Sequence, residues 1–83
     1  MALTISYFAW VRERMGIGEE SIERPVGVST VADLIAWLAA RDERGGLTFS
    51  EPGRVRAAVD GRMAGPGTAL GRDIALFPPV TGG

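Results

Sequence analysis

One segment of the sequence carries a strong helical pattern, and it limits the folds open to the whole chain. Thr30 is a good N-cap residue and Asp33 follows three positions later, at the spacing of a capping box. Apolar residues then recur at the spacing of one helical face: Val31, Leu34, Ile35 and Leu38. We expect this helix to run to about Arg41 or Glu43 and to stop at Gly45-Gly46. A chain of 83 residues with one long helix has room for a single small core.

Strand-like segments precede the helix. Residues 3–8 alternate with period two, as a half-buried strand requires. The buried face of this strand is expected to carry Leu3, Ile5 and Tyr7. Residues 9–15 break the alternation and predict a short helix closed by Gly16. Residues 19–25 are a charged strand suited to a sheet edge, with Ile22 as its main buried contact.

The second half of the chain predicts a loop, a hairpin and a central strand. Residues 47–53 read as a loop, and residues 55–59 alternate into Asp60-Gly61, a strong hairpin signal. Residues 74–77 are short and almost fully apolar, which favours a central strand. The element order predicts an α+β fold, with a four- or five-stranded mixed sheet covered on one face by one long helix. We expect this sheet to include a parallel pair.

The residue types that the chain lacks exclude several classes of function. It has no cysteine, histidine or lysine, which excludes disulfides, zinc fingers, thiolate nucleophiles and Schiff bases. We therefore expect no metal site, and an enzyme that does its own chemistry is disfavoured. The net charge of −1, with no basic cluster, argues against nucleic acid or anionic membrane as the partner. Without cysteine or a signal peptide, the chain is expected to be cytoplasmic.

The last six residues cannot build a packed element. Pro78 and Pro79 favour extended backbone, and Gly82 and Gly83 carry no side chain. We therefore divide the chain into a domain, residues 1–77, and an extended tail, residues 78–83, which reaches roughly 20 Å. The residues alone leave two readings open. The tail is either a frayed terminus or a segment that enters a channel in a partner protein.

The ending Phe77-Pro78-Pro79-Val80-Thr81-Gly82-Gly83 resembles the small, sulfur-carrying subunits of molybdopterin synthase, a ubiquitin-like β-grasp family. Three further segments are similar to that family: residues 7–13, residues 30–34 and residues 57–61. The resemblance covers essentially the whole chain. One departure is the turn Gly71-Arg72-Asp73, which is shorter than the acidic turn usual in the family.

The resemblance implies a mechanism in which partners supply the chemistry. An E1-like adenylyltransferase would use ATP to adenylate the carboxylate of Gly83, and sulfur from a sulfurtransferase would convert it to a thiocarboxylate. The large subunit of molybdopterin synthase would then pass that sulfur to cyclic pyranopterin monophosphate. The catalytic side chains would belong to the large subunit, the carrier itself would bind no cofactor, and the assembly would be a heterotetramer.

The resemblance also assigns roles to residues of the tail. Gly83 would carry the sulfur and Gly82 would allow close passage through a channel. Pro78 and Pro79 would stiffen the root of the tail. Val80 and Thr81 would be inserted into the large subunit with the rest of the tail.

Three residues outside the tail are candidates for partner binding. Phe8 and Phe77 have the opposite parity to the buried positions of their strands, so they could project from the sheet face away from the helix. The alternative for both is ordinary core packing. Arg12 could pair with an acidic residue of a partner, or be a solvated surface arginine. We assign Trp10 and Trp37 to packing.

Two other interpretations remain open. The chain could be a sulfur carrier for another pathway, such as cysteine, thiamine or tRNA thiolation, or a ubiquitin-like protein modifier. A modifier without lysine could not form lysine-linked chains of itself. The carboxylates Glu19, Glu20 and Glu23 are most simply a solvated sheet edge.

Overall fold

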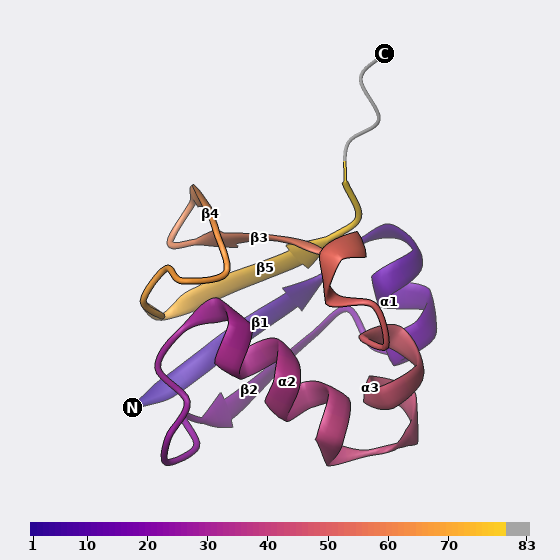
Figure 1. Cartoon of the computed structure of the whole chain (residues 1–83), viewed down its shortest axis with the longest axis horizontal. Helices are drawn as coiled ribbons and strands as arrows, with labels where there is room; N and C mark the ends of the chain where they lie inside the picture. Colours follow the sequence, from indigo (N-terminus) through magenta and orange to yellow (C-terminus); the bar gives the residue numbers. More distant parts are fainter. Residues whose placement is uncertain (80–83) are drawn as a thin grey trace.

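A five-stranded mixed sheet forms one layer of the protein (Figure 1). The computed structural model describes residues 1–79. The strands are β1 (Ala2–Tyr7), β2 (Glu19–Glu23), β3 (Arg56–Val59), β4 (Arg62–Ala64) and β5 (Asp73–Phe77). Their order across the sheet is β2-β1-β5-β3-β4. The β1–β5 pair is parallel and the other neighbours are antiparallel, which confirms the predicted mixed sheet, the central last strand and the charged edge strand β2.

The second layer is helical and covers one face of the sheet (Figure 1). It contains α1 (Ala9–Met15), α2 (Val31–Arg41), α3 (Glu43–Thr48) and the short 3₁₀ helix η1 (Pro52–Arg54). The predicted helical face is confirmed, because all four of its apolar residues are buried in the core cluster. That cluster also holds the three predicted positions of β1 and, from β5, Ile74 and Leu76.

The predicted capping box fixes the start of α2. The backbone N–H of Asp33 donates to the Thr30 hydroxyl over 3.2 Å, and the backbone N–H of Thr30 donates to the Asp33 carboxylate over 3.1 Å. Ser29 donates a further backbone N–H to the same carboxylate over 3.0 Å. These hydrogen bonds, first that of Ser29, hold the pKa of Asp33 below its usual value.

The predicted end of α2 is confirmed, but the predicted cause of that end is not. The helix ends at Arg41, where Asp42 is extended and its carboxylate accepts the backbone N–H of Gly45 over 2.7 Å. Asp42 therefore caps a new helix, α3, which contains Gly45 and Gly46. A β-carbon on Gly45 would lie 1.9 Å from the carbonyl oxygen of Leu38. The prediction that these glycines stop the helix was wrong, because Gly45 instead allows α3 to pack closely against α2.

The predicted loop over residues 47–53 is confirmed only for residues 49–51, because its two ends are helical. Helix α3 continues to Thr48, whose hydroxyl donates to the carbonyl oxygen of Arg44 over 2.7 Å, and η1 begins at Pro52. Phe49 follows α3 and is 1% exposed, so it belongs to the core. The sequence pattern missed it because Leu47 beside it faces solvent and no periodicity remains.

The Asp60-Gly61 hairpin forms as predicted and is tied to β5. Asp60 and Gly61 have φ values of 49° and 83°, and Val59 pairs with Arg62 across this two-residue turn. The Asp60 carboxylate accepts the backbone N–H groups of Arg72 and Asp73 over 3.0 and 2.9 Å. The short turn before β5 is therefore held by the hairpin.

We expect Gly71→Ala to lower the free energy of unfolding by about 1–2 kcal/mol. A β-carbon at Gly71 would lie 1.9 Å from the Asp60 carboxylate, which must then move away from the two N–H groups it accepts. Gly67→Ala is the matched control, since a β-carbon there meets no atom within 4 Å. Urea denaturation of both variants tests this, and equal midpoints would contradict it.

Candidate functional site

The central strand of the sheet leads directly into the tail. Phe77 ends β5, Pro78 is half-buried and Pro79 is exposed. Because β5 lies between β1 and β3, the root of the tail is held on both sides by hydrogen-bonded strands. The site residues Val80, Thr81, Gly82 and Gly83 lie outside the described residues.

Phe8 and Phe77 lie together beside the root of the tail. Tyr7 pairs with Leu76 in the parallel ladder, and the N–H of Phe8 donates to the carbonyl oxygen of Leu76 over 3.1 Å. Phe8 is 49% exposed and Phe77 is half-buried outside the core cluster, whereas Tyr7 and Leu76 are fully buried. The alternative of core packing was therefore wrong for both. Ala9, with φ of 51°, turns the chain into α1 directly after Phe8.

A row of small side chains extends this surface across the sheet. Register pairs Met63 with Ala58, Ala58 with Ala75, and Ala75 with Ser6, so these residues share the face away from the helices. Met63 is 71% exposed. We call this row, with Phe8 and Phe77, the open sheet face. Only its aromatic residues were predicted to project from the sheet, although strand parity predicts the same face for the rest.

Arg12 lies on α1 near the open sheet face. Its side chain is exposed and packs over Gly18, where a β-carbon would lie 3.2 Å from the guanidinium carbon. It forms no ion pair with another residue of the range 1–79. The position suits contact with a partner, and the role in partner binding stays a prediction.

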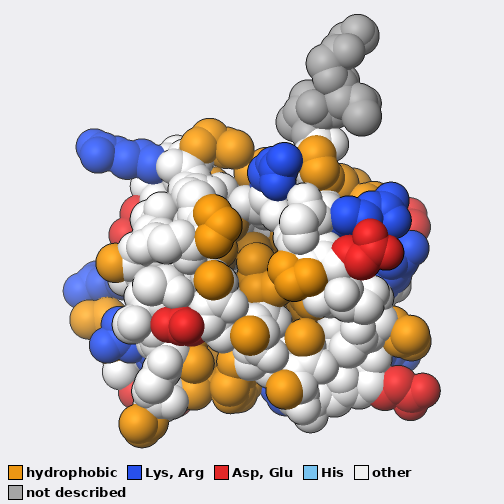
Figure 2. All heavy atoms as spheres, in the orientation of Figure 1, with side chains coloured by type: hydrophobic (Ala, Val, Ile, Leu, Met, Phe, Trp, Pro, Cys, Tyr) orange, Lys and Arg blue, Asp and Glu red, His pale blue; other side chains and the backbone are white. Residues whose placement is uncertain are grey.

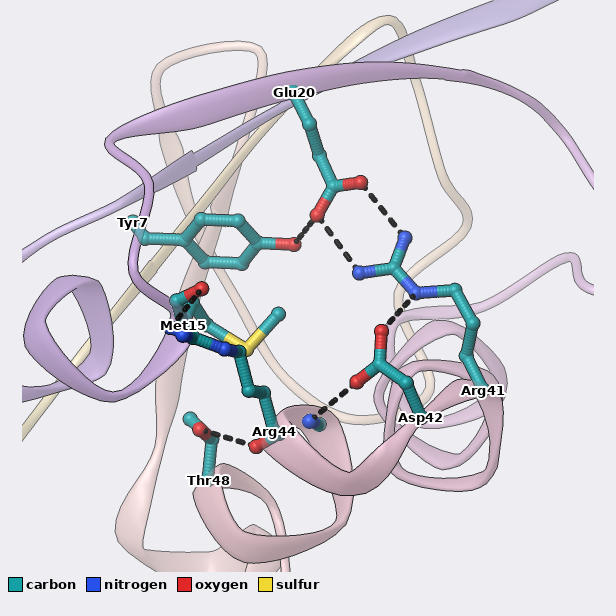
Figure 3. A network of polar contacts seen from close by, with 8 residues as sticks. Tyr7, Met15, Glu20, Arg41, Asp42, Arg44 and Thr48 are labelled. Atoms are coloured by element: carbon teal, nitrogen blue, oxygen red, sulfur yellow. Dashed lines mark hydrogen bonds and ion pairs between the residues drawn. The ribbon is translucent and has the colours of Figure 1, made fainter.

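Glu20 is part of a polar cluster on the helical side of β2 (Figure 3). Its carboxylate forms a two-fold ion pair with the Arg41 guanidinium, at 2.7 and 2.9 Å, and accepts the Tyr7 hydroxyl over 2.6 Å. The Glu20 and Arg41 side chains are only 18% and 24% exposed. The prediction of a solvated edge was therefore wrong for Glu20, because Arg41 at the end of α2 folds over it. Glu19 and Glu23 are exposed as predicted.

The pKa values in this cluster shift so that every group keeps its charge state. The hydrogen bonds from Arg41 lower the pKa of Glu20, with a further contribution from the Tyr7 hydroxyl, and partial burial opposes the shift. The bond to Glu20 raises the pKa of Arg41, and burial raises the pKa of Tyr7. None of the three can exchange a proton near neutral pH. The cluster joins β1, β2 and α2 and does not resemble a catalytic acid–base pair.

We expect Glu20→Gln to destabilise the protein by about 2 kcal/mol at pH 7, because Arg41 keeps its charge and loses its ionic partner. The pKa of Glu20 is lower in the folded protein than in the unfolded chain, where it is about 4.3. The ionised carboxylate therefore contributes its full stabilisation above the unfolded pKa, and this stabilisation is lost as the pH falls through the folded pKa. The difference between variant and wild type should therefore shrink in acid. Denaturation at several pH values measures it.

Glu19→Gln is the matched control, because Glu19 lies on the same strand with an exposed side chain. Its effect should stay within about 0.5 kcal/mol. A difference between Glu20→Gln and wild type that did not change with pH would contradict the ionic role of Glu20.

An apolar groove of about 490 Å³ lies between α2, η1 and the β3–β4 hairpin. Figure 2 shows hydrophobic side chains gathered in a hollow on this face. The lining includes Val31, Ile35, Val55 and Ala64, and its one charged side chain is Arg56. A groove without converging polar groups has no means of acid–base or nucleophilic chemistry.

The described part of the chain has neither a membrane-spanning helix nor a metal-binding cluster. No helix among residues 1–79 is long and apolar enough to cross a membrane. No cluster of three or more histidine, cysteine, aspartate or glutamate side chains in that range could hold a metal ion.

The mixed sheet, the helical layer over one face and the order of the strands define a β-grasp domain, and comparison with known proteins is more specific. Residues 5–83 match the ThiS family, and the chain belongs to that family. It is 35% identical to the molybdopterin synthase sulfur carrier subunit of Escherichia coli (strain K12) over 83 residues, which cover 98% of this chain and 99% of the relative. The family predicted from the sequence is confirmed.

Solved structures agree with this assignment. A protein described as molybdopterin converting factor subunit 1, from Pyrococcus furiosus, aligns with a TM-score of 0.74 at 30% identity, covering 96% of this chain and 99% of that one. SAMP1 from Haloferax volcanii aligns with a TM-score of 0.71 over the full length of both chains, at 22% identity. The second likeness supports the fold alone, and both confirm the predicted β-grasp architecture.

Proposed function

We propose that this chain is a sulfur carrier in molybdopterin biosynthesis and acts as the small subunit of molybdopterin synthase. The observation that carries the proposal is the full-length relation to a sulfur carrier subunit of that enzyme. The arrangement of the chain supports it, since a rigid central strand ends at Phe77 and is followed by the Pro78-Pro79 root of the tail. The partner that receives the tail is a large subunit, and the proposed assembly is a cytoplasmic heterotetramer.

The proposed chemistry takes place at the carboxylate of Gly83. One of its oxygens attacks the α-phosphorus of ATP on an E1-like adenylyltransferase, and pyrophosphate leaves. A persulfide sulfur of a sulfurtransferase attacks the acyl carbon and displaces AMP, after which a thiol reduces the acyl disulfide, forming a disulfide and releasing the thiocarboxylate. On the large subunit this sulfur attacks a carbon of cyclic pyranopterin monophosphate, and the carbon–oxygen bond at that carbon breaks as its oxygen substituent leaves. Water then cleaves the acyl–sulfur bond and restores the carboxylate.

The chain contributes position, and its partners contribute the catalytic side chains. A carboxylate is a poor electrophile until its oxygen becomes part of a good leaving group, and this sequence has no histidine, cysteine or lysine to assist. Phe8 and Phe77 offer apolar area beside the root of the tail, and Arg12 offers a cation one helical turn after Phe8. In this proposal the carrier holds no cofactor of its own, and the adenylyltransferase binds the ATP.

Mass spectrometry after co-expression with the adenylyltransferase and sulfurtransferase tests the proposal. We expect a mass gain equal to the exchange of one oxygen for one sulfur at Gly83, and molybdopterin formation when the product is mixed with the large subunit and the pterin precursor. The E. coli sulfur carrier serves as the positive control. A chain that stayed unmodified while the control was converted would overturn the proposal. A thiocarboxylate that produced no molybdopterin would assign the carrier to another pathway.

A further inference from the structure

Two arginines flank Trp10 on the helical side of the tail root, and a third arginine lies beside one of them. The guanidinium carbons of Arg14 and Arg54 lie 4.7 and 5.9 Å from the centroid of the Trp10 ring. Arg14 also lines a neighbouring hollow of about 420 Å³ together with Arg44 and Leu47. Leu47 is 66% exposed. We call these five residues the arginine–tryptophan patch.

The positive charges of this patch lack ionic partners within the protein. Among residues 1–79, Arg14, Arg44 and Arg54 form no ion pair. Glu51 lines the same small hollow as Trp10, Arg14 and Arg54, yet it pairs with neither guanidinium. Two guanidinium groups beside one ring repel each other, and a negative charge between them offsets this repulsion. The patch is thus prepared for an anionic group from outside.

The patch lies at the end of the molecule from which the tail leaves. Trp10 is two residues after Phe8, whose N–H bonds to Leu76 of β5. Arg54 is two residues before Arg56, which pairs with Phe77 at the end of β5. Figure 1 shows α1 beside this end of β5, and Figure 2 shows basic side chains gathered on that side of the molecule. A protein channel that takes up the tail presents its rim around this root, on the helical side as well as on the open sheet face.

We propose that the arginine–tryptophan patch docks an acidic segment on the rim of the large subunit, with carboxylates contacting Arg14 and Arg54. This rests on the proposed function and adds a second contact surface to it. Guanidinium groups stacked on an aromatic ring keep their N–H edges open for two-fold bonds to carboxylate. Trp and Arg are also the residue types most enriched where binding energy is concentrated.

Carboxylates fit the patch better than the phosphates of a nucleic acid. A nucleic-acid surface needs many phosphate contacts, whereas this chain has a net charge of −1 and the patch holds only three arginines. The guanidinium groups also occupy the Trp10 ring on which a base would otherwise stack. The patch therefore acts on encounter with a protein partner, by raising the association rate.

The test compares association rates with the large subunit for two variants of equal charge. Arg14→Gln/Arg54→Gln removes the patch cations, and Arg24→Gln/Arg72→Gln removes two exposed arginines near the opposite ends of β1 and β5. We expect the patch variant to associate about tenfold more slowly at low salt, with the difference vanishing near 1 M salt. The control should change by less than about twofold. At saturating large subunit, the control should transfer sulfur at the wild-type rate.

Three outcomes would overturn the patch proposal. If both variants associated equally slowly with the large subunit, the change in rate would come from net charge and not from the patch. An unchanged association rate, together with loss of binding to a single-stranded oligonucleotide probe, would assign the patch to nucleic acid. A wild-type chain that failed to bind the large subunit at all would overturn both this inference and the proposed function, whereas the first two outcomes leave the function intact. Circular dichroism of each variant confirms that the fold is unchanged.

Discussion

Deleting Gly83 should abolish sulfur transfer and leave the stability of the fold almost unchanged. The deletion leaves a carboxylate on Gly82 that is one residue, or about 3.5 Å, short of its position in the intact chain. A misplacement of even 1 Å at a reacting centre costs about 100-fold in rate. We therefore expect at least about a 100-fold loss of molybdopterin formation in a purified system.

The fold should tolerate this deletion because its core is complete without the tail. All fifteen residues of the core cluster lie between Leu3 and Leu76. The thermal midpoint of the deletion variant should equal that of the intact chain. Binding to the large subunit should survive in part through Phe8 and Phe77 on the open sheet face, so affinity and activity would separate.

Two further variants separate the position of Gly83 from the reactivity of its carboxylate. A residue appended after Gly83 keeps the distance of Gly83 from the domain but converts its carboxylate into a peptide group, so Gly83 can be neither adenylated nor thiolated. Gly82→Val keeps the carboxylate and adds a β-branched side chain where we expect the partner to form a narrow channel, so adenylation and transfer should both be weak. If the deletion variant still supported molybdopterin formation, the terminal-carboxylate mechanism would be wrong.

Local patterns predicted the elements whose hydrogen bonds are local. The capping box of Thr30 and Asp33 forms because both partners lie three residues apart, and the Asp60-Gly61 turn forms because its two residues accept positive φ. Strand parity likewise placed Phe8 and Phe77 away from the core, because side chains alternate along any strand. These features can be predicted without knowing which segments pack against them.

Interactions between distant segments were out of reach of the sequence pattern. Glu20 and Arg41 are 21 residues apart, and nothing local shows that α2 ends above β2. Phe49 is buried by elements on both sides of it in the sequence, although its own segment has no periodicity. The same limit applies to the candidate site. The sequence shows which residue types the site contains, but the arginine–tryptophan patch forms only because η1 lies beside α1.

Gly45 is the clearest case in which a local sequence pattern misleads. Glycine usually marks the end of a helix, but Gly45 lies inside α3 and allows it to pack against α2. Helices α2 and α3 meet at this residue, which is buried. A β-carbon on it would lie 1.9 Å from the carbonyl oxygen of Leu38 and 2.9 Å from its carbonyl carbon. Both atoms belong to the backbone of α2, so no side-chain rotation relieves the contact.

We expect Gly45→Ala to lower the free energy of unfolding by about 3 kcal/mol or more, since the two helices must separate or shift. Total stability for a domain of this size is on the order of 5–10 kcal/mol, so the loss would be a large part of it. A shift of α3 would also strain the hydrogen bond from Gly45 to the Asp42 cap. Urea denaturation followed by circular dichroism measures the change.

Gly46→Ala is the control that isolates the close approach from the helical preference of alanine. Gly46 is the next residue of the same helix, and a β-carbon there would lie 3.3 Å from the carbonyl oxygen of Ala39, a contact that small adjustments relieve. Because alanine favours a helix interior by about 0.5–1 kcal/mol over glycine, this variant should be unchanged or slightly more stable. Equal stability of the two variants would mean that α3 does not rest on the backbone of α2. A loss confined to Gly45→Ala would show that glycine is required there by the distance between the two helices.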